Sequence, residues 1–169
     1  AIQELLEDFD GEIESYRQAL CLSPEHPFWL YGTLARLLSG QPSQESKAEA
    51  IEIYKQGIKV DPDNVDGIGY ARLARLLSER GDVNTAIATY QKALIKQPDL
   101  EWVNYCIETL FYNKGIQFLS SQNLQAAKGC FHRVEKIKDC WEQPVWFGQN
   151  NQTWPRYKSD WVSQLENLK

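Results

Sequence analysis

The stretch Tyr31-Gly-Thr-Leu-Ala-Arg-Leu-Leu-Ser39 occurs a second time in the chain, as Tyr70-Ala-Arg-Leu-Ala-Arg-Leu-Leu-Ser78. Seven of the nine positions hold the same residue in both copies, which chance does not readily produce. In the first copy, Tyr31, Leu34, Ala35 and Leu38 are separated by three or four positions, so they share one face of an α-helix. The repeated stretch therefore predicts two equivalent helices, each with one face packed against a neighbour.

A second pattern follows each copy: a small residue, an aromatic residue four positions later, a small residue three later and a proline five beyond. Its two complete copies are Ala50, Tyr54, Gly57, Pro62 and Ala86, Tyr90, Ala93, Pro98. Degraded copies stand on either side, as Glu12, Tyr16, Ala19, Pro24 and Ala127, Phe131, Val134, Asp139. Small residues admit a close neighbour and proline ends a helix, so each copy predicts a second helix paired with the first.

These units resemble tetratricopeptide repeats, helix-turn-helix modules of about 34 residues. The stretch Phe111-Tyr-Asn-Lys-Gly-Ile-Gln-Phe118 adds the glycine and both aromatic residues of the family pattern, although Lys114 replaces the usual leucine. The resemblance implies an all-α fold, a right-handed solenoid of antiparallel helix pairs. The array is predicted over residues 1–140, as a partial unit 1–27 and units 28–66, 67–100 and 101–140.

Turn residues place some helix ends. Gly81, in Glu79-Arg-Gly-Asp82, suits the left-handed residue that ends a helix. Asp63 and Asn64, which follow Pro62, are suited to cap the next helix. Residues 100–120 exceed one standard first helix, so either that helix is extended at its start or residues 101–106 form a separate turn. The sequence leaves both alternatives open.

The resemblance also implies where a partner binds, because one flank of each first helix lines a concave groove in this family. At 100° per residue, Gly32, Arg36 and Ser39 share that flank, and Ala71, Arg75 and Ser78 repeat it. The last unit offers Tyr112, Ile116 and Leu119, and Arg72 lies near the groove edge. The predicted partner-binding residues are Arg36, Ser39, Arg72, Arg75, Ser78, Tyr112 and Ile116.

Arginine donates hydrogen bonds in a fixed fork that suits carboxylates, so an acidic or C-terminal segment is the predicted ligand. The alternative is that the arginines only form a solvated face, since exposed ion pairs contribute little. The family's chaperone-binding clamp relies on a set of lysine, asparagine and arginine residues that this chain lacks. Gly32, Ala71 and Tyr112 occupy positions where that clamp needs polar side chains. A chaperone co-factor role is therefore disfavoured.

Composition excludes several classes of protein. The chain has 169 residues, 43% of them hydrophobic and 24% charged, which is ordinary for a globular domain. The net charge is −5 and the basic residues are scattered, so nucleic acid is not an expected partner. No run approaches the roughly 20 apolar residues that span a bilayer, and the acidic start lacks a secretory signal, so a cytoplasmic protein without membrane contact is expected. The absence of methionine predicts a piece of a longer chain.

The segment 141–169 is rich in aromatic residues. Its four tryptophans are Trp141, Trp146, Trp154 and Trp161. One interpretation is a C-terminal capping helix, since a solenoid leaves its last apolar face open. The alternative is that the tryptophans are displayed for a partner or a carbohydrate.

Catalytic and cofactor-binding motifs are absent from the sequence, so no enzyme activity, cofactor or metal is expected. The four cysteines, at positions 21, 106, 130 and 140, are expected to be free thiols. Cys130 and His132 lie two apart, about 200° around a helix, and could not hold one metal ion from a regular helix. His26 and His132 lack a partner for acid-base chemistry.

The predicted function is a protein-protein interaction module that binds a partner peptide or helix in its groove. Two alternatives remain open. The chain could be the regulatory or substrate-recruiting domain of a larger enzyme, such as a transferase. It could also be a scaffold that self-associates through its repeat ends.

Overall fold

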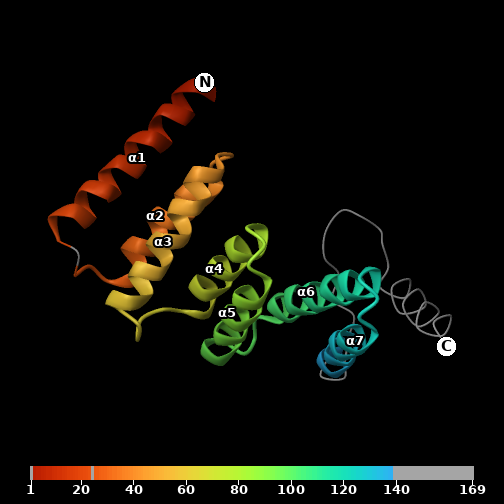
Figure 1. Cartoon of the computed structure of the whole chain (residues 1–169). Coiled ribbons are helices and arrows are strands. Elements are labelled where there is room, and N and C mark those ends of the chain that lie inside the picture. Colours follow the sequence, from red (N-terminus) through yellow and green to blue (C-terminus); the bar gives the residue numbers. More distant parts are fainter. Residues whose placement is uncertain (1, 24, 139–169) are drawn as a thin grey trace. The chain divides into compact units, whose positions relative to one another are not determined.

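The computed structural model describes residues 2–23 and 25–138, and within these ranges it contains helices and no strand (Figure 1). The predicted capping segment 141–169, with its four tryptophans, lies outside the described residues, as do Asp139 and Cys140. The helices are α1 (Ile2–Leu22), α2 (Phe28–Gly40), α3 (Gln44–Val60), α4 (Gly67–Glu79), α5 (Val83–Lys96), α6 (Glu101–Ser120) and α7 (Leu124–Lys138).

The helices pack as successive pairs, α2 with α3, α4 with α5 and α6 with α7, and α1 lies against α2 (Figure 1). Each pair falls within one predicted unit. The core consists of the residues that the two sequence patterns picked out: Tyr31, Leu34, Ala50 and Tyr54 are fully buried. The prediction of an all-α solenoid of antiparallel helix pairs is confirmed, because the repeated small and apolar positions form one continuous core along the pairs.

Glycines let the helices approach closely at two places around the first full unit. A Cβ atom at Gly57 would lie 2.5 Å from the Cβ of Tyr31, so α2 and α3 could not pack as they do with a larger residue there. A Cβ atom at Gly69 would lie 2.6 Å from the Cζ of Phe28. The Phe28 ring, which is only 6% exposed, is therefore held where α2, α3 and α4 meet.

The end of α4 follows the predicted geometry. Gly81 has a φ of +93°, which confirms its left-handed conformation. The N–H of Asp82 donates to the carbonyl of Leu77 at 2.9 Å and the N–H of Gly81 donates to Ser78 at 3.0 Å. Those two bonds satisfy carbonyls that the last turn would leave unpaired.

The end of α6 uses the same geometry without a glycine. Gln122 has a φ of +59°, and the N–H of Asn123 donates to the carbonyl of Phe118 at 2.8 Å. A residue with a side chain is strained when its backbone is left-handed. The turn after α6 therefore lowers the free energy of unfolding, whereas the turn after α4 has a glycine at that position and avoids the strain.

The start of α4 differs from the prediction. Asp66, rather than Asp63 or Asn64, caps this helix by accepting a hydrogen bond from the N–H of Gly69 at 2.7 Å. Asp61 instead caps α2, the first helix of its own unit, because it accepts a hydrogen bond from the N–H of Phe28 at 2.9 Å, and it also accepts one from the side chain of Asn64. An aspartate that follows one helix thus caps the first helix of the same unit, since the chain has turned back on itself.

Residues 101–120 form one continuous helix, α6, so the alternative of a separate turn at 101–106 is wrong. Val103, Ile107 and Phe111 are buried along its length. These residues recur every four positions, so the extension continues the apolar face and packs it against the preceding pair.

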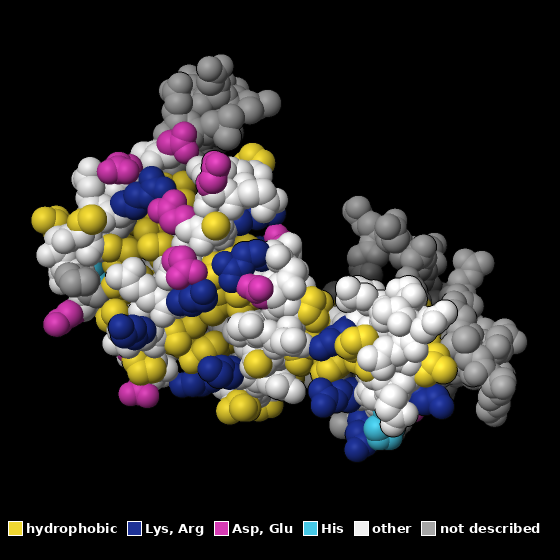
Figure 2. All heavy atoms as spheres, viewed as in Figure 1, with side chains coloured by type: hydrophobic (Ala, Val, Ile, Leu, Met, Phe, Trp, Pro, Cys, Tyr) yellow, Lys and Arg dark blue, Asp and Glu magenta, His cyan; other side chains and the backbone are white. Residues whose placement is uncertain are grey.

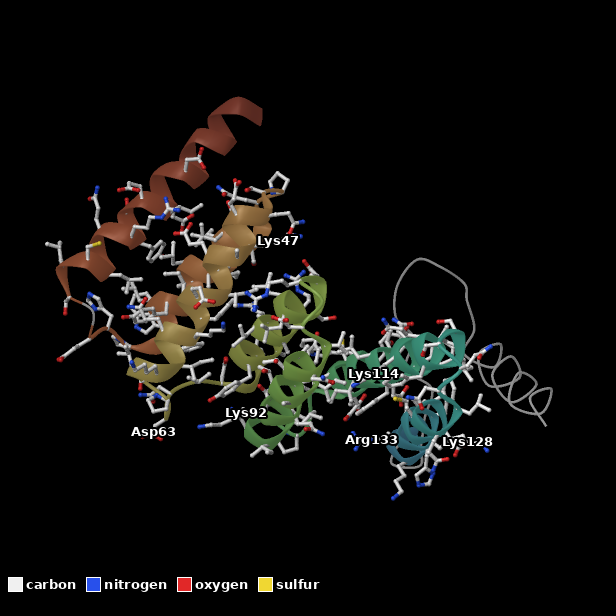
Figure 3. The ribbon with its side chains drawn as sticks, viewed as in Figure 1. Lys47, Asp63, Lys92, Lys114, Lys128 and Arg133 are labelled. Atoms are coloured by element: carbon white, nitrogen blue, oxygen red, sulfur yellow. The ribbon has the colours of Figure 1, made fainter. Side chains whose placement is uncertain are left out.

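Ion pairs join neighbouring elements. The guanidinium of Arg17 on α1 forms a two-pronged pair with Glu49 on α3, at 3.0 Å and 2.7 Å. Lys47 lies near the start of α3 (Figure 3), and its Nζ atom is 3.0 Å from a carboxylate oxygen of Glu79 on α4. Glu79 also accepts from Arg75 at 2.8 Å.

Candidate functional site

A surface pocket of about 260 Å³ opens between α2 and α4, above α3. Its lining includes Phe28, Trp29, Arg36, Tyr54, Asp66 and Arg72. The pocket is smaller than sites that enclose a whole cofactor, which span about 300–1,000 Å³. Its volume suits one side chain of a larger ligand.

Two arginines from successive repeats meet at this pocket. Arg36 projects from α2 and Arg72 from α4, and both side chains are exposed. None of the ion pairs formed within residues 2–23 and 25–138 involves either of them. Their charges are therefore available to an anionic group of a ligand.

A buried hydroxyl lies beside these arginines. Tyr54 is fully buried, and its hydroxyl has no hydrogen-bond partner among the described residues. Burial raises the pKa of Tyr54, while the nearby guanidinium groups, Arg72 first, act in the opposite direction. The phenol therefore stays neutral at physiological pH and keeps its proton for donation.

The pocket also has an aromatic wall. The indole of Trp29 is 61% exposed, although tryptophan usually covers its large apolar surface. Trp29 lines the pocket on the same helix as Arg36, close to the fixed ring of Phe28. An exposed tryptophan beside a cationic pocket can anchor an apolar side chain of a partner.

The other predicted groove residues have different surroundings. Arg75 bonds to Glu79, and the hydroxyl of Ser39 donates to the backbone carbonyl of Arg36 at 2.8 Å. Ser78 and Ile116 are half-buried. The ring of Tyr112 lies 5.9 Å from that of Phe131 and so packs against α7. The structure brings Arg36 and Arg72 together, and Arg75 lies outside the lining of their pocket.

Sequence reasoning missed three residues of this site: Trp29, Tyr54 and Asp66. Tyr54 was assigned to the core because it is the aromatic residue of the second-helix pattern, and its ring does lie there. Only the structure shows that its hydroxyl has no hydrogen-bond partner in the part of the chain that is described. Trp29 precedes the first repeated stretch by two residues, so its position on the groove flank could have been inferred from helical spacing.

Charge is unevenly distributed over the visible face (Figure 2). Basic and acidic side chains are mixed over α1 to α5, whereas Lys and Arg predominate on the α6–α7 hairpin. Lys114, Lys128 and Arg133 belong to this hairpin (Figure 3). Lys114 donates to Asn84 at 2.6 Å, and Arg133 lies over the ring of Phe111, so these two cations already have local contacts.

The cysteines and histidines do not converge on a site. Cys130 is 7% exposed, whereas the His132 side chain is 65% exposed and lies 3.9 Å from Glu135, so the two point in different directions. Burial raises the pKa of the Cys130 and Cys106 thiols. No group of three potential metal ligands occurs within residues 2–23 and 25–138. In the same part of the chain, no helix has the length and apolarity to span a bilayer.

A sequence model of the tetratricopeptide repeat matches residues 69–94, which include the second repeated stretch and most of α5. The chain contains a tetratricopeptide repeat at these residues. Its fold is similar to that of MamA, with a TM-score of 0.56 over 86% of this chain and 92% of the other, at 15% identity. A second MamA structure, residues 41 to the end of the protein from Desulfovibrio magneticus RS-1, gives 0.52 over 83% and 72%, also at 15% identity. Identity this low shows the shared fold alone.

A curated relative of this chain is cellulose synthase operon protein C from Pseudomonas fluorescens (strain SBW25). The two are 28% identical over 109 residues, or 63% of this chain. The chain spans about 8% of the length of that relative. Most of the relative therefore has no counterpart in this chain.

Proposed function

We propose that this repeat array binds a segment of a partner protein that carries acidic residues, along the groove flank of its first helices. Tetratricopeptide repeats serve in protein-protein interaction and scaffold roles and are typically non-catalytic. The observation that carries the proposal is the pocket between α2 and α4, where Arg36 and Arg72 are exposed and form no ion pair with the described residues. Ser39, Arg75, Ser78, Tyr112 and Ile116 are the further proposed groove residues.

The physical basis is the shape of a stacked array. Helix pairs that bury one continuous core leave an extended surface, which offers many shallow contacts instead of one deep reaction site. Two guanidinium groups on successive repeats supply positive charge along that surface. Electrostatic complementarity then favours acidic segments and increases their rate of association.

The test reverses charge in the groove. The double variant Arg36→Glu with Arg75→Glu should reduce partner capture at least tenfold, and capture by the wild type should weaken as salt increases. The matched control is Lys59→Glu with Lys92→Glu, which reverses two exposed lysines on the second helices α3 and α5. Full capture by the groove variant, or equal losses in both variants, would refute the groove. Circular dichroism must show that both variants remain folded.

A second candidate is a regulatory or substrate-recruiting domain of a larger enzyme, such as a transferase. It is favoured by the match to a short part of cellulose synthase operon protein C. In this role the partner would be another component of the same assembly. Cross-linking in cells that express the full gene, followed by identification of the linked component, separates this role from free peptide capture.

Self-association is the third candidate, because the ends of a helical array can stack. Light scattering over a concentration series measures it directly. A mass that rises with concentration supports a scaffold, and a constant monomer mass removes this candidate.

A further inference from the structure

The pocket between α2 and α4 contains a buried hydroxyl group that costs folding free energy for no evident structural reason. Tyr54 lines this pocket and is fully buried, and its hydroxyl makes no hydrogen bond within the described residues. A buried hydroxyl without a hydrogen-bond partner destabilises the folded protein, so its presence needs an explanation. A phenylalanine would fill the same space without that cost.

The equivalent tyrosine of the next repeat has different neighbours. Tyr90 occupies the same place in the second-helix pattern and is 2% exposed. Burial and the nearby thiol of Cys106 on α6 raise the pKa of Tyr90. The charged groups that act on Tyr54 are the guanidinium groups of Arg72, Arg36 and Arg75.

These surroundings point to an anionic acceptor. The exposed guanidinium groups of Arg36 and Arg72 line the same pocket as Tyr54 and belong to long, flexible side chains that can move to admit a ligand. The neutral phenol of Tyr54 and the guanidinium groups of Arg36 and Arg72 can all donate hydrogen bonds to one ligand in the pocket. A carboxylate has two oxygens and accepts from several donors at once.

The net charge of the pocket favours some anions over others. Asp66 lines the same pocket, where its carboxylate caps α4 by accepting a hydrogen bond from the N–H of Gly69. Two guanidinium groups and one carboxylate leave one net positive charge. A monoanionic carboxylate matches this charge, whereas a phosphate, with a charge of about −2 at pH 7, meets repulsion from Asp66.

We infer that the pocket is a subsite for one side-chain carboxylate of the bound segment, placed between Arg36 and Arg72, where it accepts a hydrogen bond from the hydroxyl of Tyr54. This inference rests on the proposed function and names the group that is recognised. The segment presents aspartate or glutamate next to an apolar side chain that lies on Trp29. A side chain is favoured over a chain terminus, because the groove flank continues past the pocket toward Arg75 and lets the segment run on.

The test begins with peptides chosen by the protein itself. Two libraries of displayed random peptides are selected on the full chain, one with the random stretch inside a glycine-serine linker and one with it at a free C-terminus. The inference predicts that the internal library yields peptides with an acidic residue beside an apolar one. A selected peptide is then synthesised with glutamate, glutamine or phosphoserine at the acidic position.

The Tyr54→Phe variant supplies the decisive measurements. It should bind the glutamate peptide about tenfold or more weakly than the wild type, and the glutamine peptide equally well, because the lost hydrogen bond is to a charged group. Its resistance to urea should equal or exceed that of the wild type. The matched control Tyr90→Phe removes the equivalent hydroxyl of the next repeat, which lies outside the pocket lining, and should bind the glutamate peptide normally.

The outcomes separate the two proposals. Binding that depends on Arg36 and Arg75 but is unchanged in Tyr54→Phe leaves the groove intact and overturns the carboxylate subsite. Tighter binding of the phosphoserine peptide, selection from the free C-terminal library alone, or loss of stability in Tyr54→Phe also overturns it. Binding that survives the double charge reversal, or selection of no peptide from either library, counts against the groove and the subsite together.

Discussion

The substitution Gly57→Ala tests the close packing on which the array depends. The added Cβ atom would lie 2.5 Å from the Cβ of Tyr31 and 2.8 Å from its Cγ. Carbon atoms in contact are about 3.5–4.0 Å apart, so α2 and α3 would have to separate by about 1 Å. The atoms that clash are next to the backbone of α2 and cannot swing away as the end of a side chain could.

The magnitude follows from two opposing effects. Overpacking of a core costs about 1–3 kcal/mol, and this clash belongs in the upper half of that range. Replacing a glycine within a helix by alanine raises the free energy of unfolding by up to about 1 kcal/mol. The expected net loss is about 1–2 kcal/mol in the free energy of unfolding, or a Tm lower by about 2–8 °C for a chain of this size.

The measurement is urea unfolding followed by far-UV circular dichroism, with Gly129→Ala as the matched control. Gly129 also lies within a helix, but a Cβ atom there would meet nothing within 4 Å. The control should therefore gain about 0.5–1 kcal/mol from helix propensity alone. If Gly57→Ala is as stable as the control, the contact between α2 and α3 is looser than the structure has it and the packing argument fails.

Two further predictions concern helix ends. Gln122→Gly should increase the free energy of unfolding by about 1 kcal/mol, and Gly81→Ala should lower it by a similar amount, because both positions have left-handed backbone. The urea midpoints of the two variants should therefore shift in opposite directions. Shifts of the same sign would contradict this prediction. The pKa of Asp61 lies below its ordinary value of 3.8, first because it accepts from the N–H of Phe28. Its stabilisation is complete above that value and is lost as the pH falls through the lower folded pKa. Asp61→Asn should therefore lose less stability than the wild type on acidification from about pH 5 to 2, and equal losses would contradict the assignment.

The sequence predicted most of the fold because its signals are local. The spacings around Tyr31 and Tyr54 report which helix face is apolar, and a glycine such as Gly81 reports where the backbone must become left-handed. Both are properties of a few consecutive residues. Asp66 was harder to assign, since Asp63 and Asn64 are equally good capping residues and the choice depends on where α4 can begin while packing on its neighbours.

The candidate site was only partly predictable. Arg36 and Arg75 occupy matching positions in the repeated stretch, which favoured them as a pair. In the structure Arg75 bonds to Glu79, and it is Arg72 that shares a pocket with Arg36. Such a pairing depends on the rotation of α4 relative to α2, and no spacing within one helix reports that rotation.

The sequence by itself determined that the chain forms repeated helix pairs, since helical periodicity, small residues and helix-ending prolines act over a few residues. The tertiary structure decided which charged side chains are already paired, which remain exposed, and that the hydroxyl of Tyr54 has no partner among the described residues. Ion pairs and buried hydrogen bonds join residues that are distant in sequence, so their energies are fixed only when the helices are packed against one another.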